Sequence, residues 1–368
     1  MLATQPVNHG MPPLDMTGKP VSMFEFWPSS VFYAPVAVQW LWYGVKYRSF
    51  GLPLIANPTI SLSGMVGESK DAILSLAGEH AKKWILPYVA WEKSLFPPET
   101  QAHQALSKLH KAGLRFPIVA KPDLGCRGAG VRLVENKHAL EEYLRLFPLG
   151  AKLILQEKAP YNAEAGVFYV RYPGEEKGRI FSLTLKYNPF VVGDGVRTLA
   201  ELIDDDPRAG KVSHLYRTRH EDKLDLVLQN GEEFRLAFAG SHCRGAIFRN
   251  GSEYITEALT RKLDEIFDDF PGFHYGRIDL KFRDIESLMK GEDFVMLEVN
   301  GASSEAAHIW DKDATLKDAF TTLLDQYRML FEIGDKQRRA GCSVPSLLDL
   351  YKAWRTEKSL VRHYPSTD

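Results

Sequence analysis

The chain has 368 residues, of which 45% are hydrophobic and 25% are charged. This length exceeds the usual size of one domain, and the composition is that of an ordinary globular protein. The 46 basic residues nearly balance the 47 acidic ones and leave a formal net charge of -1, which argues against nucleic acid as a partner. Cys126, Cys243 and Cys342 are scattered without CxxC spacing. This usage argues against a disulfide framework and favours a reducing cytoplasm.

Residues 24–48, FEFWPSSVFYAPVAVQWLWYGVKYR, form an aromatic and aliphatic segment that ends with Lys46 and Arg48. The segment is nearly long enough to cross a bilayer, but Glu25, Gln39 and two prolines interrupt it, and no signal-peptide cleavage pattern follows. We expect a helix that is buried against the body or in a homodimer interface. Peripheral contact with a membrane surface and a true span stay as alternatives.

The next residues predict a small βαβ-like unit, which with the aromatic segment makes up residues 1–95. The pattern indicates a strand over 52–58, a loop and helix over 63–81, and a strand over 82–91. Ser69 and Lys70 stand at the predicted helix start, where free N–H groups favour a carboxylate or phosphate of a substrate. The alternative is that Ser69 caps a surface helix while Lys70 is solvated.

A glycine-rich loop lies in the stretch VAKPDLGCRGAGVRLV, residues 119–134. A helix over 99–111 and a strand over 116–122 precede the loop, and a return strand over 131–134 follows it. The glycines allow backbone N–H groups to approach a phosphate, and Lys121 adds a positive charge. Because no helix follows the loop directly, neither the Rossmann nor the Walker pattern fits.

The second half of the chain reads as one mainly antiparallel sheet backed by helices. A helix over 138–146 leads to the strand 151–159, and strand-like segments then dominate from Gly166 to Gly301. Helices are predicted over 198–203 and 256–267, and the charge-rich stretch 213–220 is expected to be a solvated loop. The tail carries a helical apolar pattern over 343–359 and is expected to pack on the body.

Two neighbouring strands carry a candidate metal site. Arg277 and Asp279 are two residues apart on one strand, and Glu298 and Asn300 are two apart on the next, so each pair shares one face of the sheet. Two carboxylates and an amide oxygen are hard ligands suited to Mg²⁺ that carries nucleotide phosphates. Either fragment alone would be weak evidence.

Together with the glycine loop, these fragments resemble the ATP-grasp superfamily over about residues 96–331. The matching motifs are KPDLGCRGAGV, LQEKAP, RID and LEVN. Within the superfamily the chain looks like the D-alanine:D-alanine ligases and the ATP-grasp core of cyanophycin synthetase, the latter also because of VVGDGVRTLAELI, residues 191–203. The resemblance implies an α+β fold in which two subdomains, residues 96–160 and 161–331, clasp ATP, followed by a helical tail over 332–368.

The resemblance also implies roles for individual residues. Lys121 and the glycine loop would contact the ATP phosphates, with Lys186 as a second phosphate lysine, while Arg277 and Lys121 would stabilise the charge that develops in phosphoryl transfer. Residues 156–159 would line the adenine, and Glu164 would accept hydrogen bonds from the ribose. Arg127 would add a phosphate contact or be solvated. The implied nucleotide-binding residues are Lys121, Gly125, Arg127, Gly128, Gly130, Gln156, Glu157, Lys158, Ala159, Glu164 and Lys186, and the implied ligands of one or two Mg²⁺ ions are Asp279, Glu298 and Asn300.

The activity that the resemblance implies is an ATP-dependent ligation of a small-molecule carboxylate to an amine through an acyl phosphate. Two alternatives stay open: a kinase that phosphorylates a small acceptor, and a non-catalytic nucleotide-binding module at a membrane. His242 and Arg244 are candidates for binding the substrate carboxylate or the transferred phosphate, unless they form a structural turn. Ser304 and Glu305 are candidates for selecting the amine, unless they begin a helix.

Overall fold

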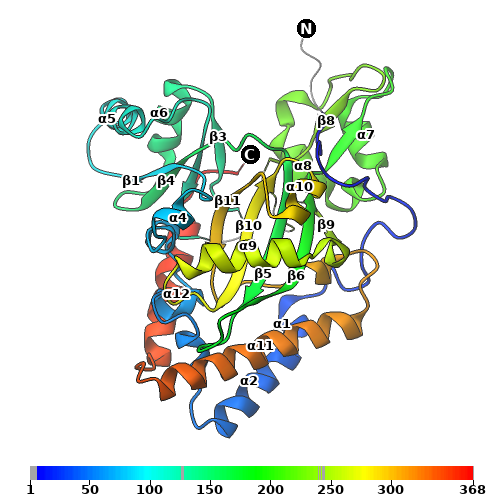
Figure 1. Ribbon diagram of the computed structural model, residues 1–368. Coiled ribbons are helices and arrows are strands. Elements are labelled where there is room, and N and C mark those ends of the chain that lie inside the picture. Colours follow the sequence, from blue (N-terminus) through cyan, green and yellow to red (C-terminus); the bar gives the residue numbers. More distant parts are fainter. Residues whose placement is uncertain (1–5, 126–127, 239, 241, 243–244, 368) are drawn as a thin grey trace.

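The computed structural model describes residues 6–125, 128–238, 240, 242 and 245–367 (Figure 1). Its first subdomain is built on a four-stranded antiparallel sheet with the order β1-β4-β2-β3. Two helices pack on this sheet, and they share a core of aliphatic residues with it, including Leu109, Leu140 and Leu153. The elements are β1 (Tyr88–Glu92), α5 (Pro98–Lys111), β2 (Ile118–Pro122), β3 (Arg132–Val134), α6 (Lys137–Leu146) and β4 (Lys152–Glu157).

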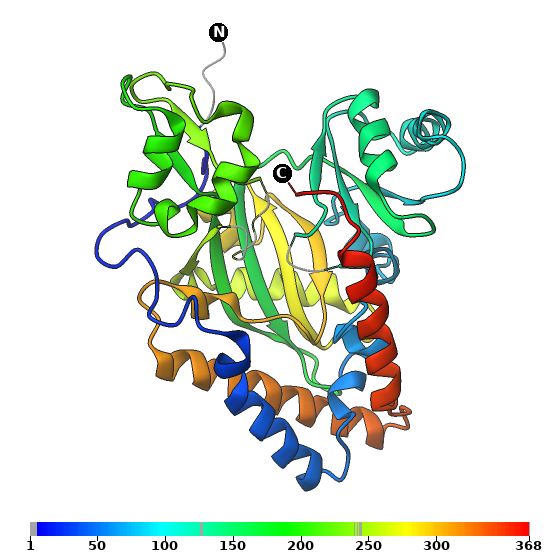
Figure 2. The ribbon, with the colours of Figure 1, turned by 180° about the vertical axis from the view of Figure 1, so that it is seen from behind.

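The second subdomain is built on a five-stranded antiparallel sheet with the order β11-β10-β5-β6-β9. Helices cover both of its faces (Figure 2), so neighbouring residues of β5 enter different cores: Val167 packs beside the α9 side and Phe168 beside the α11 side. The elements are β5 (Ala163–Val170), β6 (Arg179–Tyr187), β9 (Ile247–Asn250), α9 (Glu257–Asp268), β10 (Tyr275–Phe282), α10 (Ile285–Lys290), β11 (Phe294–Asn300) and α11 (Leu316–Arg339).

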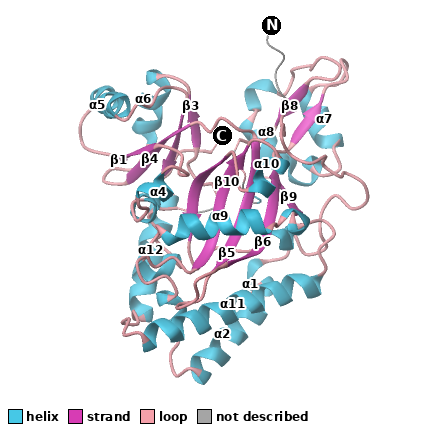
Figure 3. Ribbon diagram, viewed as in Figure 1, coloured by secondary structure: helices cyan, strands magenta, loops and turns pink. Residues whose placement is uncertain are grey.

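A smaller unit with its own core stands beside the second subdomain. It consists of the strand pair β7 (Phe190–Val192) and β8 (Glu233–Arg235) with the helices α7 (Leu199–Asp205) and α8 (Ser213–Arg219). Figure 3 shows the three groups of strands, with helices between and around them. The α+β class and the two main subdomains agree with the expectation from the sequence.

The aromatic N-terminal segment lies along α11. It forms α1 (Ser29–Phe32) and α2 (Ala34–Lys46), and Phe24, Phe32 and Val36 are buried against Ile309 and Leu323. This buried face agrees with the expected packing against the body. In the described part of the chain, no helix has both the length and the apolar character needed to cross a membrane. A homodimer interface and membrane-surface contact stay predictions.

The C-terminal tail forms α12 (Leu347–Val361), which runs from the end of α11 towards the first sheet. Beyond it, the ring of Tyr364 stacks on Phe147 at 5.3 Å, and its hydroxyl donates to the Leu124 carbonyl at 2.8 Å. The hydroxyl of Thr367 accepts from the Gly130 amide at 3.0 Å and donates to the Gly128 carbonyl at 2.8 Å. The tail therefore packs on the body, as expected, at the glycine loop.

The N-terminal unit differs from the predicted βαβ pattern. Residues 52–55 form a 3₁₀ helix instead of a strand, because Pro53 lacks the N–H that a strand ladder needs and Leu52 and Ile55 are buried against Phe331 of α11. The expected helix is divided into α3 (Lys70–Leu74) and α4 (Glu79–Lys82). Because β1 pairs antiparallel with β4, it belongs to the sheet of the first subdomain. The expected loop over 213–220 is largely helix α8.

Candidate active site

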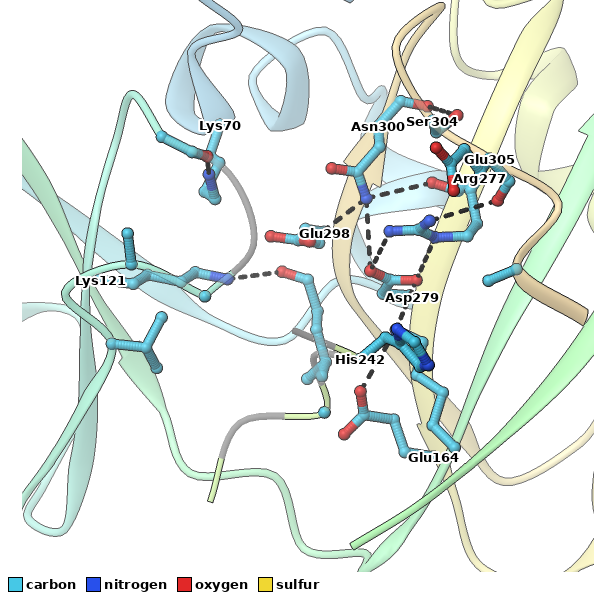
Figure 4. A pocket seen from close by; sticks show the side chains of 18 of the residues that line it. Lys70, Lys121, Glu164, His242, Arg277, Asp279, Glu298, Asn300, Ser304 and Glu305 are labelled. Carbon is cyan, nitrogen blue, oxygen red and sulfur yellow. Dashed lines mark hydrogen bonds and ion pairs between the residues drawn. The ribbon is translucent and has the colours of Figure 1, made fainter. Parts of the chain in front are cut away.

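A cavity of about 540 Å³ lies where the two subdomains meet. The first sheet supplies Lys121 and Gln156 to its wall, and the second supplies Glu164, Lys186 and the strand pair β10–β11. Figure 4 shows Lys121 on one side and Arg277 on the other, with Glu298 between them. The cavity therefore brings together residues of the two sheets, such as Lys121 and Glu298, that are about half the chain apart in sequence.

The strand register places the predicted metal ligands together. Asp279 of β10 lies opposite Glu298 of β11, and Arg277 lies opposite Asn300. The Asn300 amide nitrogen donates to Glu298 Oε1 at 3.2 Å and to Asp279 Oδ2 at 3.5 Å. Three oxygen-bearing side chains thus converge on one point of the cavity wall (Figure 4).

Asp279 is buried among cations. Lys186 Nζ lies 2.8 Å from its Oδ1, and Arg277 donates from Nε at 2.8 Å and from Nη2 at 3.1 Å. Burial by itself would raise the pKa of Asp279, but the charges of Arg277 and Lys186 outweigh it and hold the pKa well below its usual range. The carboxylate is therefore ionised and its two cations are fixed.

The donor set fits a magnesium ion. The described residues contain no group of three His, Cys, Asp or Glu side chains placed to hold a metal, so a metal here would use the two carboxylates and Asn300. Mg²⁺ is commonly held by one or two carboxylates, with phosphate and water oxygens completing its shell. A rotation of the Asn300 side-chain amide by 180° exchanges its nitrogen and oxygen, so that Oδ1 would face the metal position beside Asp279 and Glu298.

A β-bulge joins the two subdomains at this site. Between Asp279, which pairs with Glu298, and Leu280, which pairs with Met296, the strand β11 has one extra residue, Leu297. Its carbonyl accepts hydrogen bonds from Lys121 Nζ at 3.0 Å and from Gln156 Nε2 at 3.3 Å. Burial lowers the pKa of Lys121 to about 8, although the charge of Glu298 opposes this effect.

Most of the predicted nucleotide-binding residues line the cavity. Glu164 lies between two lysines, 3.4 Å from Lys186 Nζ and 3.4 Å from Lys281 Nζ. Gly130 does not line the cavity, since it packs against Pro122 and Tyr364, and Arg127 lies outside the described residues. The predicted residues found in the wall are Lys121, Gly125, Gly128, Gln156, Glu157, Lys158, Ala159, Glu164 and Lys186.

Some of the predicted substrate residues line the cavity and others do not. Lys70 lines the cavity and donates from Nζ to the Gly125 carbonyl at 2.9 Å. Ser69 does not: its hydroxyl caps α3 by accepting from the Ala72 amide, and it donates to Asp123 at 2.8 Å. The Ser69 oxygen is thus used at the helix start, which fits the capping alternative for this residue.

Two of the other substrate candidates, His242 and Glu305, contact Trp310 in the cavity wall. His242 Nε2 lies 2.9 Å from Glu25 Oε1, and its ring stacks on Trp310 at 5.2 Å. Ser304 lines the cavity but donates its hydroxyl to the Gly301 carbonyl at 2.6 Å. Glu305 also lines the cavity, and Arg244 lies outside the described residues.

Sequence reasoning missed two contributions to the wall. Glu68 is partly buried, and desolvation raises the pKa of its carboxyl to about 8, although it accepts from the Gly301 amide at 2.9 Å. The aromatic N-terminal segment supplies Glu25, Trp27 and Tyr33. The only sequence signal for Glu68 was its place in the same glycine-rich turn as Ser69 and Lys70. The residues of the N-terminal segment carried no signal for a place in the cavity wall.

No protein-family model and no curated protein matches the sequence. Among solved structures, the chain is similar to D-alanine–D-alanine ligase from Bacillus anthracis, with 14% identity over 74% of this chain and 72% of that one and a TM-score of 0.39. It is similar to VanG D-Ala:D-Ser ligase from Enterococcus faecalis, with 13% identity, coverage of 73% and 64%, and a TM-score of 0.40.

A third similar structure is a bifunctional glutathione synthetase from Pasteurella multocida, with 14% identity over 70% of this chain, 36% of that chain and a TM-score of 0.34. The match thus spans about a third of the length of the Pasteurella enzyme and just under two thirds of the Enterococcus enzyme. All three are named as a ligase or a synthetase, the kind of enzyme that the sequence resembles. Superpositions this weak carry no detail of the site.

Proposed function

We propose that the protein is an ATP-grasp ligase that joins a carboxylate to an amine with consumption of ATP. The observation that carries the proposal is the arrangement of one cavity between two subdomains: Lys121 faces it from one sheet, and Arg277, Asp279 and Glu298 face it from the other. A triphosphate needs positive charge and oxygen ligands for its metal at the same place, and this wall offers both.

The proposed reaction has two steps. In the first, an oxygen of the substrate carboxylate attacks the γ-phosphorus of ATP, the bond to the β,γ-bridging oxygen breaks, and ADP leaves with that electron pair. In the second, the amine nitrogen attacks the acyl carbon of the acyl phosphate, phosphate leaves, and the nitrogen loses a proton. The product is an amide. Neither step requires a nucleophilic side chain.

The chain's own residues would act by position and charge. Lys121 and Lys186 would bind phosphate oxygens, and Gln156 to Ala159 would hold the adenine. Arg277, fixed by Asp279, would stabilise the negative charge that develops on the transferred group. Mg²⁺, when bound by Asp279, Glu298 and Asn300, would neutralise charge on the triphosphate.

The extent of the cavity favours two small-molecule substrates over one. Besides the metal-ligand residues, its wall includes Tyr33, His242 and Glu305, which are linked through contacts with one another and with Trp310. A kinase would need only an acceptor beside the γ-phosphate, whereas a ligase needs space for an acid and an amine together.

The test is phosphate release from ATP and Mg²⁺ across a panel of carboxylates, each with and without a panel of amines. Release that requires both an acid and an amine is the expected result. Release with the acid alone would support the kinase, and nucleotide binding without release under any pair would support the non-catalytic module.

A further inference from the structure

Glu305 is a carboxylate in the cavity wall that forms no ion pair among the described residues. Its Oε1 accepts from the Tyr33 hydroxyl, and its Oε2 accepts from Trp310 Nε1 at 3.1 Å. Arg277 donates to the backbone carbonyl of Glu305 at 3.2 Å and forms its ion pair with Asp279, so its charge reaches the Glu305 carboxylate without a direct ion pair. Two neutral donors orient this carboxylate but do not neutralise it.

Most other acids of the cavity have an ion-pair partner, a backbone donor or a place in the metal-ligand set. Asp279 and Glu164 are paired with lysines, and Glu25 with Arg208 at 2.8 Å. Glu298 faces Asp279 in the metal-ligand set, and Glu68 accepts from the Gly301 amide at 2.9 Å. Glu357 accepts from the Gly67 amide at 2.7 Å, and Glu157 lies at the end of β4 in the first sheet. Beside Trp310, Glu305 is therefore the acid for which the described residues supply neither an ion pair nor a role with the metal.

Aromatic side chains surround this carboxylate. Tyr33 and Trp310 hold it from two sides, and Trp27 and Phe248 line the same cavity. Trp310 is itself fixed between Phe32, at 4.9 Å, and His242, at 5.2 Å between ring centroids. Aromatic faces attract a cation electrostatically and bury apolar groups well.

We propose that this part of the cavity binds the amine substrate, and that the substrate is an amine with an aromatic or bulky apolar group. The ammonium pairs with Glu305, and the apolar group lies against the rings of Trp27, Trp310 and Phe248. The inference rests on the proposed ligase function for the identity of the ligand as the second substrate. It makes the N-terminal segment, through Trp27 and Tyr33, a determinant of specificity.

The test measures binding of three probes to the full chain with ADP and Mg²⁺ by titration calorimetry: phenethylamine, ethylamine and 3-phenylpropionate. Phenethylamine is expected to bind about tenfold or more tightly than ethylamine, because it buries a ring. Glu305→Gln is expected to weaken phenethylamine about tenfold or more while leaving ADP and 3-phenylpropionate unchanged. Equal binding of phenethylamine by wild type and Glu305→Gln would overturn the inference.

Further variants separate charge from shape. Glu305→Asp keeps the charge and is expected to retain part of the affinity, while Trp310→Leu is expected to weaken phenethylamine but not ethylamine. Glu99→Gln, which changes an exposed acid in the first turn of α5, is the matched control and should bind all probes as wild type does. If Trp310→Leu leaves the preference for phenethylamine intact, the aromatic part of the proposal is wrong.

The two proposals can fail separately. Binding of phenethylamine that depends on Glu305, without phosphate release for any acid and amine, would keep the cation site and remove the ligase. Phosphate release that requires both an acid and an amine, but responds to amine concentration alike in wild type and Glu305→Gln, would keep the ligase and remove the cation site.

Discussion

At the scale of single residues, the site is dominated by charges whose state is set by burial. Glu68 is the clearest case, because desolvation of its carboxyl outweighs the Gly301 amide, 2.9 Å away, and the charges of Lys70 and Arg277, which favour its ionised form. Its pKa in the folded protein, about 8, lies above the ordinary value of 4.5. The folded state therefore holds a proton that the unfolded chain releases in mild acid.

This proton makes the stability of the protein depend on pH. Because the folded pKa of Glu68 is raised, its contribution to stability is complete below pH 4.5 and is lost as the pH rises through 8. The difference in free energy of unfolding between wild type and Glu68→Gln should therefore fall by roughly 1 kcal/mol per pH unit between pH 5 and 8. Urea titrations over this range would measure it, with Glu99→Gln as control. If the free energies of unfolding of wild type and Glu68→Gln changed with pH in the same way, the raised pKa of Glu68 would be contradicted.

The catalytic charges give a second prediction at this scale. Lys121→Ala and Glu298→Gln should each lower phosphate release by about 100-fold or more, because one removes a phosphate contact and the other a metal ligand. Circular dichroism should remain that of wild type. Rates of either variant close to those of wild type would remove the site assignment, and Glu253→Gln, an acid outside the cavity, serves as control.

The sequence predicted those residues whose position follows from strand geometry. Arg277 and Asp279 are spaced by two on one strand and Glu298 and Asn300 by two on the next, so the pleat placed each pair on one face, and the register of the two strands brings the pairs together. Glu68 and Glu305 depend on where a turn and a loop meet the cavity, which no periodicity encodes. For the same reason, the pattern around Ser69 could not separate an anion site from a helix cap.

At the scale of elements, α12 links the base of the second subdomain to the glycine loop of the first. The helix has no buried residue, but Glu357 accepts from the Gly67 amide at 2.7 Å, and further contacts come from the segment beyond it. There Tyr364 packs on Phe147 and Gly130, and Thr367 bonds to the backbone of Gly128 and Gly130. The tail thus contributes to the shape of the phosphate-facing loop.

The contact of Tyr364 can be tested by stability. Tyr364→Ala should lower the free energy of unfolding by about 2 kcal/mol, because it removes a stacked ring and the hydrogen bond to the Leu124 carbonyl. Tyr351→Ala changes the same residue type on α12, where the side chain is 51% exposed, and should stay within about 0.5 kcal/mol of wild type. Equal losses of free energy of unfolding in both variants would mean that Tyr364 does not pack on the glycine loop.

The elements with strong periodicity were predicted well, as α5, α6, α9 and the strands of the second sheet illustrate. The prediction of a strand over 52–58 was wrong, because a short apolar run can be buried as a 3₁₀ turn as easily as in a ladder, and tertiary packing against α11 decides. The pairing of β1 with β4 could not be predicted from local pattern either, since β4 follows β1 by about 60 residues.

At the scale of the whole molecule, the outward side of α2 is an apolar surface with nothing packed on it in the described chain. Val38, Leu41, Trp42 and Val45 are each more than 60% exposed there. The helix contains no acidic residue, and Lys46 with the exposed Arg48 follows directly at its end. Such a combination of apolar face and flanking bases fits the surface of an anionic bilayer.

Peripheral contact is therefore the expected outcome for this face. The protein should sediment with vesicles that contain an anionic lipid more than with neutral ones, and Trp42→Ser with Val45→Ser should abolish the difference. Leu95→Ser, at another exposed apolar site, is the control. Sedimentation unaffected by vesicles, together with concentration-dependent dimers in light scattering that the double variant removes, would instead assign the face to a second copy.

The extra residue in β11 has a consequence for how the site would respond to mutation. Lys121 and Gln156 hold the opposite subdomain through the main-chain carbonyl of Leu297, and every amino acid carries that group. Replacing the Leu297 side chain would leave both hydrogen bonds to its carbonyl in place. A mutational scan would therefore report a tolerant position, although the carbonyl connects the two subdomains. An ester substituted for the amide between residues 297 and 298, which makes that carbonyl a poorer acceptor, would expose its importance.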